Sequence, residues 1–257
     1  MEFQTLVVEA KTAVARITLN RPEKRNPLSR QTLRELADAA HWLDAQPEVR
    51  VVVVRGAGGS FCAGADLGLF SGPAQGSPRD NADLGRQMAD ALEGMRPVSI
   101  AAIEGWCVGG GLVLAAACDL RVASEDARFS IPEVDLGIPL AWGGIPRLVR
   151  EIGAARTKEL VLTCRPFGAA EAKAAGFLNR VVPAEALEAE VDGLARSLAA
   201  KPGFPVFATK RHVNAVTSQM VGTSRAWSDA DGLMSSLADE ECAQARRSYL
   251  ASRRRSS

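Results

Sequence analysis

The sequence lacks the features that mark several large classes of protein. It has no excess of charge, because 31 basic and 30 acidic side chains leave a formal net charge of +1 over 257 residues. This balance does not support binding to nucleic acid or to another polyanion. Its five cysteines are scattered without the spacing of metal ligands, so no metal site is expected. Their odd number, in a chain without a visible signal peptide, predicts reduced thiols and a cytoplasmic location.

Membrane-spanning runs and histidine-based motifs are also missing. The stretch 97–120 is apolar enough to raise the question of a membrane span, but Glu104 and a run of glycines interrupt it. We interpret it as a buried strand followed by a buried helix, and we expect no membrane association. The two histidines, His41 and His212, stand outside any recognised site, and no Ser-His-Asp constellation is visible.

What the sequence does contain is an alternation of strand and helix patterns. The patterns predict strands at 6–8, 14–19, 49–54, 98–103 and 120–123, and a helix at 108–117. The nearly all-valine run at 49–54 is typical of a strand buried on both faces of a parallel sheet. Ser29 predicts the N-cap of a helix, and from residue 157 onward the pattern is helical. We therefore expect a core over residues 1–195 and a C-terminal helical region over residues 196–257.

One segment of the predicted core has the composition of a loop. Residues 69–83 are rich in Gly, Pro, Ser and Asp. They predict a mobile surface loop that could act as a lid, followed by an amphipathic helix through Leu92.

Two glycine-containing segments are the candidate sites of chemistry. Gly109, Gly110 and Gly111 follow a predicted strand and open an apolar helix. A helix N-terminus presents unpaired N–H groups, and glycine lets a ligand approach them closely. Close packing of the helix on the strand explains such a triplet equally well. The triplet fits neither the Gly-x-Gly-x-x-Gly dinucleotide motif nor a phosphate loop.

The second segment, residues 60–67, comes one turn after the all-valine strand. Its small residues also expose the backbone. Where two such segments end neighbouring strands, their N–H groups can converge on one carbonyl oxygen and stabilise an oxyanion by roughly 3–4 kcal/mol per donor. The sequence thus predicts a site that polarises a carbonyl group.

Four motifs, in matching order, resemble the enoyl-CoA hydratase/isomerase (crotonase) superfamily. They are Phe-Cys-Ala-Gly-Ala-Asp-Leu at 61–67, Ile-Glu-Gly-Trp-Cys-Val-Gly-Gly-Gly-Leu at 103–112, Cys-Asp-Leu-Arg-Val-Ala at 118–123 and Phe-Ser-Ile-Pro-Glu-Val-Asp-Leu-Gly-Ile at 129–138. The resemblance runs from Arg21 to Pro183. It implies an α/β fold, with a crotonase-like core of repeated ββα units and a C-terminal α-helical trimerisation region. It therefore also implies a homotrimer or a dimer of trimers.

The resemblance further implies what the site binds. Its partner is an acyl-CoA thioester, whose carbonyl oxygen lies between the N–H groups of Ala63 and Gly110, beside Gly109. Coenzyme A is part of the substrate, so no separate cofactor is expected. The path of the nucleotide and pantetheine would be lined by Lys24, Arg25, Asn26, Ala63, Ala65 and Asp66. Lys24 and Arg25 are equally well explained as solvated charges of a turn.

The acid or base that the resemblance implies is Glu133. Family hydratases use two carboxylates, one on the helix after the glycine triplet and one in the Pro-Glu loop. Glu133 matches the second, but Val113 stands at the position of the first. Each positioned acid or base is typically worth 10²–10⁴-fold in rate, so ordinary hydration is expected to be poor. A single two-way base suits isomerases of the Δ3-to-Δ2 type, which rely on one Glu at this place.

Three further residues have open roles. Asp135 would face the same way as Glu133 in an extended segment and form a carboxylate pair with it, or it caps or pairs within its own loop. Trp142 replaces the small residues usual in hydratases and forms either a wall of the acyl pocket or a core aromatic. Cys62 is interpreted as a small packing residue.

The reaction itself is left open by the fold. The alternatives to an isomerase are a classical enoyl-CoA hydratase of fatty-acid oxidation, another crotonase reaction such as hydrolysis or ring opening, and a non-catalytic acyl-CoA carrier.

Overall fold

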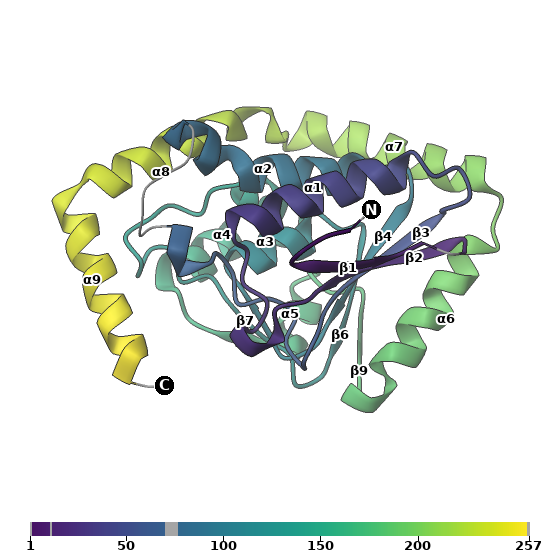
Figure 1. The fold of residues 1–257 in the computed structure, drawn as a ribbon, viewed down its shortest axis with the longest axis horizontal. Helices are drawn as coiled ribbons and strands as arrows, with labels where there is room; N and C mark the ends of the chain where they lie inside the picture. The colour runs from purple at the N-terminus through teal and green to yellow at the C-terminus, as the bar shows by residue number, and fades with distance from the viewer. Residues whose placement is uncertain (1, 11, 70–76, 256–257) are drawn as a thin grey trace.

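A six-stranded sheet is the centre of the fold (Figure 1). The structure is a computed structural model and describes residues 2–10, 12–69 and 77–255. In spatial order the strands are β1 (Leu6–Glu9), β2 (Val14–Leu19), β3 (Val51–Gly56), β4 (Val98–Ile103), β6 (Leu120–Ser124) and β9 (Arg180–Val182). β1 runs antiparallel to β2, and the other neighbouring strands are parallel. The predicted hairpin and parallel core are confirmed.

The valines of β3 show why this strand has no polar face. Val51 and Val53 pack in a cluster with residues of α6 (Leu187–Ala199). The alternate residues, Val52 and Val54, belong to the cluster that includes α1 (Arg30–Asp44) and α2 (Pro78–Gly94). Both faces of the strand are therefore covered, as the continuous valine run predicts for a parallel sheet.

A second, smaller sheet reveals the repeat within the core. It contains β5 (Trp106–Val108), β7 (Arg128–Ser130) and β8 (Phe167–Gly168), in that order. β5 follows β4 and leads into α3 (Gly110–Ala116), while β7 follows β6 and leads through a turn to α4 (Gly144–Thr163). A strand in each sheet followed by a helix thus recurs along the chain, which confirms the expected ββα units. The short helix α5 (Ala169–Ala174) follows β8.

Local capping sequences decide where α1 and α2 begin. Ser29 accepts a hydrogen bond from the Thr32 N–H at 3.1 Å, as its predicted N-cap role requires. The prediction of a loop over residues 69–83 is wrong from Pro78 onward, because α2 already begins there. Ser77 caps that helix and Pro78 occupies its first turn, a start signal that the loop-like composition hid. Residues 70–76 of the predicted loop lie outside the described residues.

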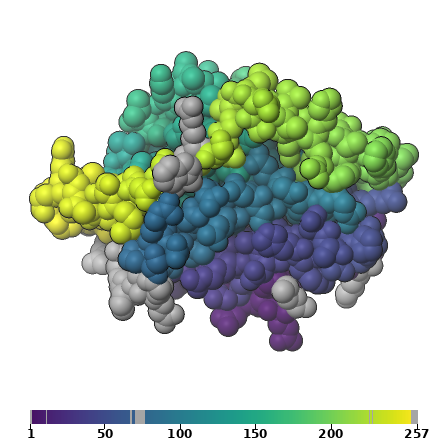
Figure 2. Space-filling model, turned by 90° about the horizontal axis from the view of Figure 1, so that it is seen from above, coloured from purple at the N-terminus to yellow at the C-terminus, as the bar shows by residue number. Residues whose placement is uncertain are grey.

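The last α-helices of the described residues are α7 (Gly203–Met220), α8 (Asp229–Ala238) and α9 (Glu240–Arg255). The Lys210 Nζ of α7 lies 2.8 Å from Asp119 Oδ2, beside the start of β6. On α8, Asp231 Oδ1 lies 2.8 Å from Arg79 Nε of α2. Figures 1 and 2 show α9 extending from one end of the molecule.

The region after residue 157 is less uniformly helical than predicted, because β8 and β9 interrupt it. Strands of two or three residues leave no period in a sequence, so the pattern could not reveal them. The division at residue 195 stays a prediction, and α6 runs across that position. Within the described residues, no helix has both the length and the hydrophobicity that crossing a membrane requires.

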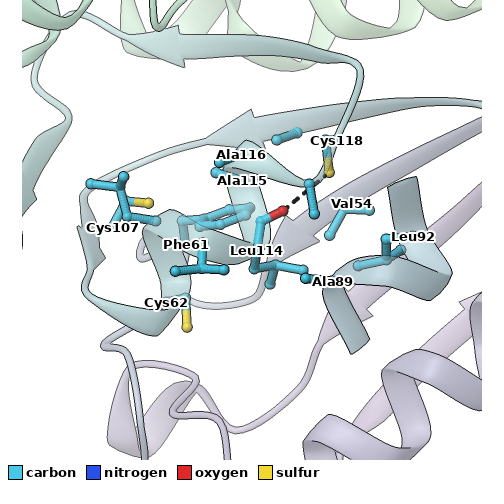
Figure 3. Close-up of a cluster of buried hydrophobic side chains, with 14 of the residues drawn as sticks. Val54, Phe61, Cys62, Ala89, Leu92, Cys107, Leu114, Ala115, Ala116 and Cys118 are labelled. Atoms are coloured by element: carbon cyan, nitrogen blue, oxygen red, sulfur yellow. Dashed lines mark hydrogen bonds between the residues drawn. The ribbon is translucent and has the colours of Figure 1, made fainter. Parts of the chain in front are cut away.

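One apolar cluster contains buried residues of both segments of the candidate site (Figure 3). Phe61 and Cys62 follow β3, and both are fully buried. In the same cluster lie Leu92 of α2 and Leu114 of α3. The loop after β3 and the helix after β5 are thus anchored to one core, which fixes their relative position.

Candidate active site

The two glycine-containing segments lie against each other, as the sequence predicts. The Cys62 N–H donates to Trp106 O at 2.9 Å, and the Val108 N–H donates to Cys62 O at 3.0 Å. A β-carbon on Gly64 would lie 2.7 Å from Val108 O, and one on Gly111 would lie 2.7 Å from Cys62 Cβ. Both glycines are therefore required by direct contact between the two segments.

The prediction of Ala63 as an oxyanion donor is wrong. Its N–H donates to the carbonyl oxygen of Arg25 at 2.8 Å, so it is already paired within the protein. The Arg25 carbonyl is brought there by a tight turn, in which Arg25 and Asn26 both adopt the left-handed conformation. The buried Asn26 holds this turn by donating from Nδ2 to Ala57 O and Ser60 O, each at 2.8 Å.

Ala65 has the orientation that was expected of Ala63. Leu28 donates its N–H to Gly64 O at 2.8 Å, and its carbonyl accepts from the Asp66 N–H at 3.0 Å. In a trans peptide the N–H points opposite to the preceding carbonyl. The Gly64 carbonyl faces Leu28, so the Ala65 N–H faces away from it. Ala65 itself lines the largely apolar cavity described below.

Gly110 supplies the second candidate donor. It is the first residue of α3, and the first N–H groups of a helix have no partner within the helix. The preceding Gly109 has φ 49° and donates its own N–H to Ser130 O at 2.9 Å. Gly110 lines the same cavity as Ala65. The donor pair that fits the geometry is therefore Ala65 with Gly110.

The cavity beside these donors has a volume of about 230 Å³ and is largely apolar. Five residues that the sequence singled out meet in its lining: Ala65, Gly110, Val113, Glu133 and Trp142. Sequence reasoning missed Arg30 and the α8 side chains Leu233, Met234 and Leu237, which also line it. No local motif marks these α8 residues, because they reach the site only through the packing of α8 beside α2.

Glu133 is the acidic group of this lining. It lies in the turn after β7, where its carbonyl accepts from the Ile138 N–H at 3.0 Å, and only 8% of its surface is exposed. Burial raises the pKa of the Glu133 carboxyl to about 7, and among the described residues its Oε2 has no hydrogen-bond partner. A β-carbon on Gly109 would overlap Glu133 Oε1. The carboxyl thus lies directly against the glycine triplet.

Asp135 does not pair with Glu133, and the prediction of a carboxylate pair is wrong. The segment is a tight turn, closed by the Leu136 N–H to Pro132 O at 3.0 Å, and is not extended. Residues two apart in such a turn face different directions. Asp135 is exposed, whereas Glu133 is buried.

Val113 and Trp142 both line this cavity. Val113 is buried in α3, one turn after Gly110, and its Cγ2 would be 2.9 Å from a β-carbon on Gly144. No proton can be bound or released at this side chain. Trp142 is a buried aromatic that also lines the cavity, and its role as a wall of an acyl pocket stays a prediction.

Of the residues expected along the coenzyme A path, Ala65 lines the cavity, and the others lie outside its lining. Lys24 and Arg25 are exposed on the turn that contacts Ala63. Asp66 lies next to them, with its Oδ2 2.8 Å from Arg21 Nη1. Partial burial disfavours ionisation of Asp66, but the hydrogen bonds from Arg21 and the Gly68 N–H, together with the positive charges of Arg21 and Lys24, outweigh it and the pKa of this carboxyl is lowered. These charges are partly engaged within the protein.

Glu133→Gln should stabilise the protein at high pH only. The folded-state pKa of about 7 lies above the ordinary value of 4.5, so the unfolded chain ionises this carboxyl first as pH rises. Stability is thus lost between these values and stays low above pH 7. We expect the variant to be about 3 kcal/mol more stable than the wild type at pH 8, and equal to it near pH 4. Urea unfolding at both pH values measures this.

Asp135→Asn is the matched control for that measurement, because it removes an exposed carboxyl from the same turn. It should show no comparable gain at pH 8. An equal gain for Glu133→Gln at both pH values would contradict the assignment of a neutral buried carboxyl.

The chain is similar to known proteins over nearly its whole length. The family model of enoyl-CoA hydratase/isomerase matches residues 9–255. A short-chain-enoyl-CoA hydratase of Clostridium acetobutylicum is 34% identical over 243 residues, which are 94% of this chain and 93% of that protein. The crystal structure of an enoyl-CoA hydratase from Mycobacterium avium subsp. paratuberculosis has a TM-score of 0.88 at 28% identity, over 96% of this chain and 99% of that one.

A Thermobifida fusca structure in complex with acetoacetyl-CoA has a TM-score of 0.77 at 33% identity, and the match covers 88% of this chain and 93% of that one. The family match spans nearly the whole chain and includes every residue of the candidate site. This protein therefore belongs to the enoyl-CoA hydratase/isomerase family.

Proposed function

We propose that this enzyme binds an acyl-CoA thioester and moves a double bond from the Δ3 to the Δ2 position. The thioester oxygen accepts hydrogen bonds from the N–H groups of Ala65 and Gly110. The acyl chain occupies the apolar cavity, and Glu133 is the base. A single observation carries the proposal: one buried carboxyl with its pKa near neutrality faces this cavity, and valine stands where a second carboxylate would be.

The reaction needs one proton to leave and one to return. Glu133 removes a proton from C2 of a 3-enoyl-CoA, and the electron pair of that C–H bond passes into the thioester, giving a dienolate. The two N–H groups stabilise the negative charge on oxygen. The protonated Glu133 then delivers its proton to C4, the electrons shift back, and a C2–C3 double bond results. A carboxyl with a pKa of about 7 is suited to both directions of transfer near neutral pH.

Hydration of a 2-enoyl-CoA is the second candidate, because the short-chain relative from Clostridium acetobutylicum is named a hydratase. Water would then have to be held by Glu133 and backbone groups alone. Val113 argues against an efficient version of this reaction.

The wider assignments of the proposal rest on the family and not on the described contacts. Coenzyme A would pass the turn that carries Lys24, Arg25 and Asp66, and no separate cofactor takes part. A homotrimer or dimer of trimers and a cytoplasmic location stay predictions.

Glu133→Gln should abolish isomerisation. We expect the wild type to convert 3-enoyl-CoA faster than it hydrates 2-enoyl-CoA, with a rate that rises with pH through an apparent pKa near 7. The variant should lose 10²–10⁴-fold in kcat, because the only base of the proposed mechanism is gone. Product analysis by chromatography measures both reactions.

Asp135→Asn serves as the control and should keep the wild-type rate. Tight binding of acyl-CoA without any turnover would contradict the proposal and support a non-catalytic carrier. Faster hydration than isomerisation would support the hydratase.

Val113→Glu should raise hydration. A carboxylate at this position lines the same cavity as Glu133 and could orient a water molecule against the double bond. We expect hydration of crotonyl-CoA to rise by at least about tenfold over the wild type. Val113→Gln is the control, since it has the same length without an acid or base. Failure of hydration to rise would show that Val113 is not the reason for poor hydration.

A further inference from the structure

Trp142 occupies an unusual position beside the proposed oxyanion donors. It adopts the left-handed conformation with φ 63°, which a bulky side chain rarely does. It is only 8% exposed, yet it lines the cavity. Such a conformation persists where the surroundings hold it in place.

The indole of Trp142 is held between two glycines of different helices. A β-carbon on Gly85 of α2 would overlap its atoms Cγ, Cδ2 and Cε2. A β-carbon on Gly110 of α3 would overlap Cζ3 on the opposite part of the ring and would lie 3.1 Å from both Cε3 and Cη2. The indole therefore fills the space between α2 and the first residue of α3.

Gly85 has no other evident role. It lies in the interior of α2, where glycine is less favourable than alanine. The three atoms that a β-carbon on Gly85 would approach most closely all belong to Trp142. A β-carbon on Gly94, at the end of the same helix, would have nothing within 4 Å. The lack of a side chain at Gly85 thus leaves a space on α2 that the indole occupies.

The same helix also holds the main chain of this loop. The fully buried Arg147 donates from Nη1 to Trp142 O at 3.3 Å and from Nη2 to Asp90 Oδ1 of α2 at 2.8 Å. On the other side, the Gly143 N–H donates to Asp229 Oδ2 of α8 at 2.8 Å. The backbone of this loop can therefore not shift without breaking these bonds, so a displaced indole has to rotate about its own side-chain bonds.

We propose that Trp142 is the wall that limits the length of the acyl chain, and that Gly85 is the positioning residue that seats this wall. The inference rests on the proposed binding of an acyl-CoA. A side chain at position 85 pushes the indole toward the cavity and Gly110. Removal of the indole extends the cavity toward α2, so longer acyl chains fit.

Calorimetric binding of saturated acyl-CoA esters from four to twelve carbons tests this without turnover. Trp142→Gly, which also suits the left-handed backbone, should raise affinity for the longest esters relative to butyryl-CoA by at least about tenfold. Gly85→Ala should weaken binding of the longest ester that the wild type accepts by a similar factor. Gly94→Ala is the matched control and should bind like the wild type.

A double-mutant comparison tests the contact between Gly85 and Trp142 directly. Gly85→Ala should lower Tm by more than about 4 °C when Trp142 is present, and should leave Tm unchanged or raised in a Trp142→Gly background. Where Trp142→Gly does not fold, Trp142→Phe is used in its place. Its dependence of affinity on acyl-chain length should be intermediate, and Gly85→Ala should lower its Tm by less than it lowers the Tm of the wild type.

The outcomes distinguish a failure of this inference from a failure of the proposed function. An unchanged length profile in the Trp142 variants, or an equal Tm loss from Gly85→Ala in both backgrounds, would overturn the inference alone. Absence of acyl-CoA binding by the wild type would overturn the proposed function with it.

Discussion

Contact between two stretches of backbone constrains this site more than any side chain does. The segment after β3 and the start of α3 approach so closely that a β-carbon on Gly64 would lie 2.7 Å from Val108 O. Their N–H groups are thus positioned by the fold and by the buried cluster behind them, and not by rotamers. A donor fixed in this way needs no reorganisation when charge develops on a carbonyl oxygen. The helix start at Gly110 lies at this contact, and the orientation of Ala65 follows from the pairing of its two neighbours with Leu28.

The buried carboxyl of Glu133 links function to stability. A buried carboxyl with an unpartnered oxygen is destabilising once it is ionised, and proteins keep such groups mainly where chemistry needs them. Here the same burial that lowers stability above neutral pH brings the carboxyl pKa to about 7. Gly109 makes room for this carboxyl, so the glycine triplet serves both one of the proposed oxyanion donors and the proposed base.

Much of the core could be predicted from patterns that are local. The valines of β3 predict a strand buried on both faces, and Ser29 predicts the N-cap of a helix. Both predictions depend only on nearby residues, and both are confirmed. The choice between Ala63 and Ala65 was not accessible in this way. It depends on which backbone groups are already paired with Arg25 and Leu28, and a motif carries no information on that pairing.

Other features could not be predicted from the sequence, for different physical reasons. Asp135 was misplaced because the alternation of strands was applied to a turn. The α8 side chains reach the cavity through contacts between segments far apart in the chain. Trp142 attracted attention as an exception to the family pattern, but its fit to Gly85 is a matter of three-dimensional shape.

The most direct test of the account follows a labelled proton. A 3-enoyl-CoA that carries deuterium at both C2 positions is converted in ordinary water, and the product is analysed by mass spectrometry and NMR. If Glu133 alone moves the proton within the largely apolar cavity, part of the deuterium removed from C2 appears at C4 of the 2-enoyl-CoA product. A main product of 3-hydroxyacyl-CoA, or a 2-enoyl-CoA without any deuterium at C4, would contradict it.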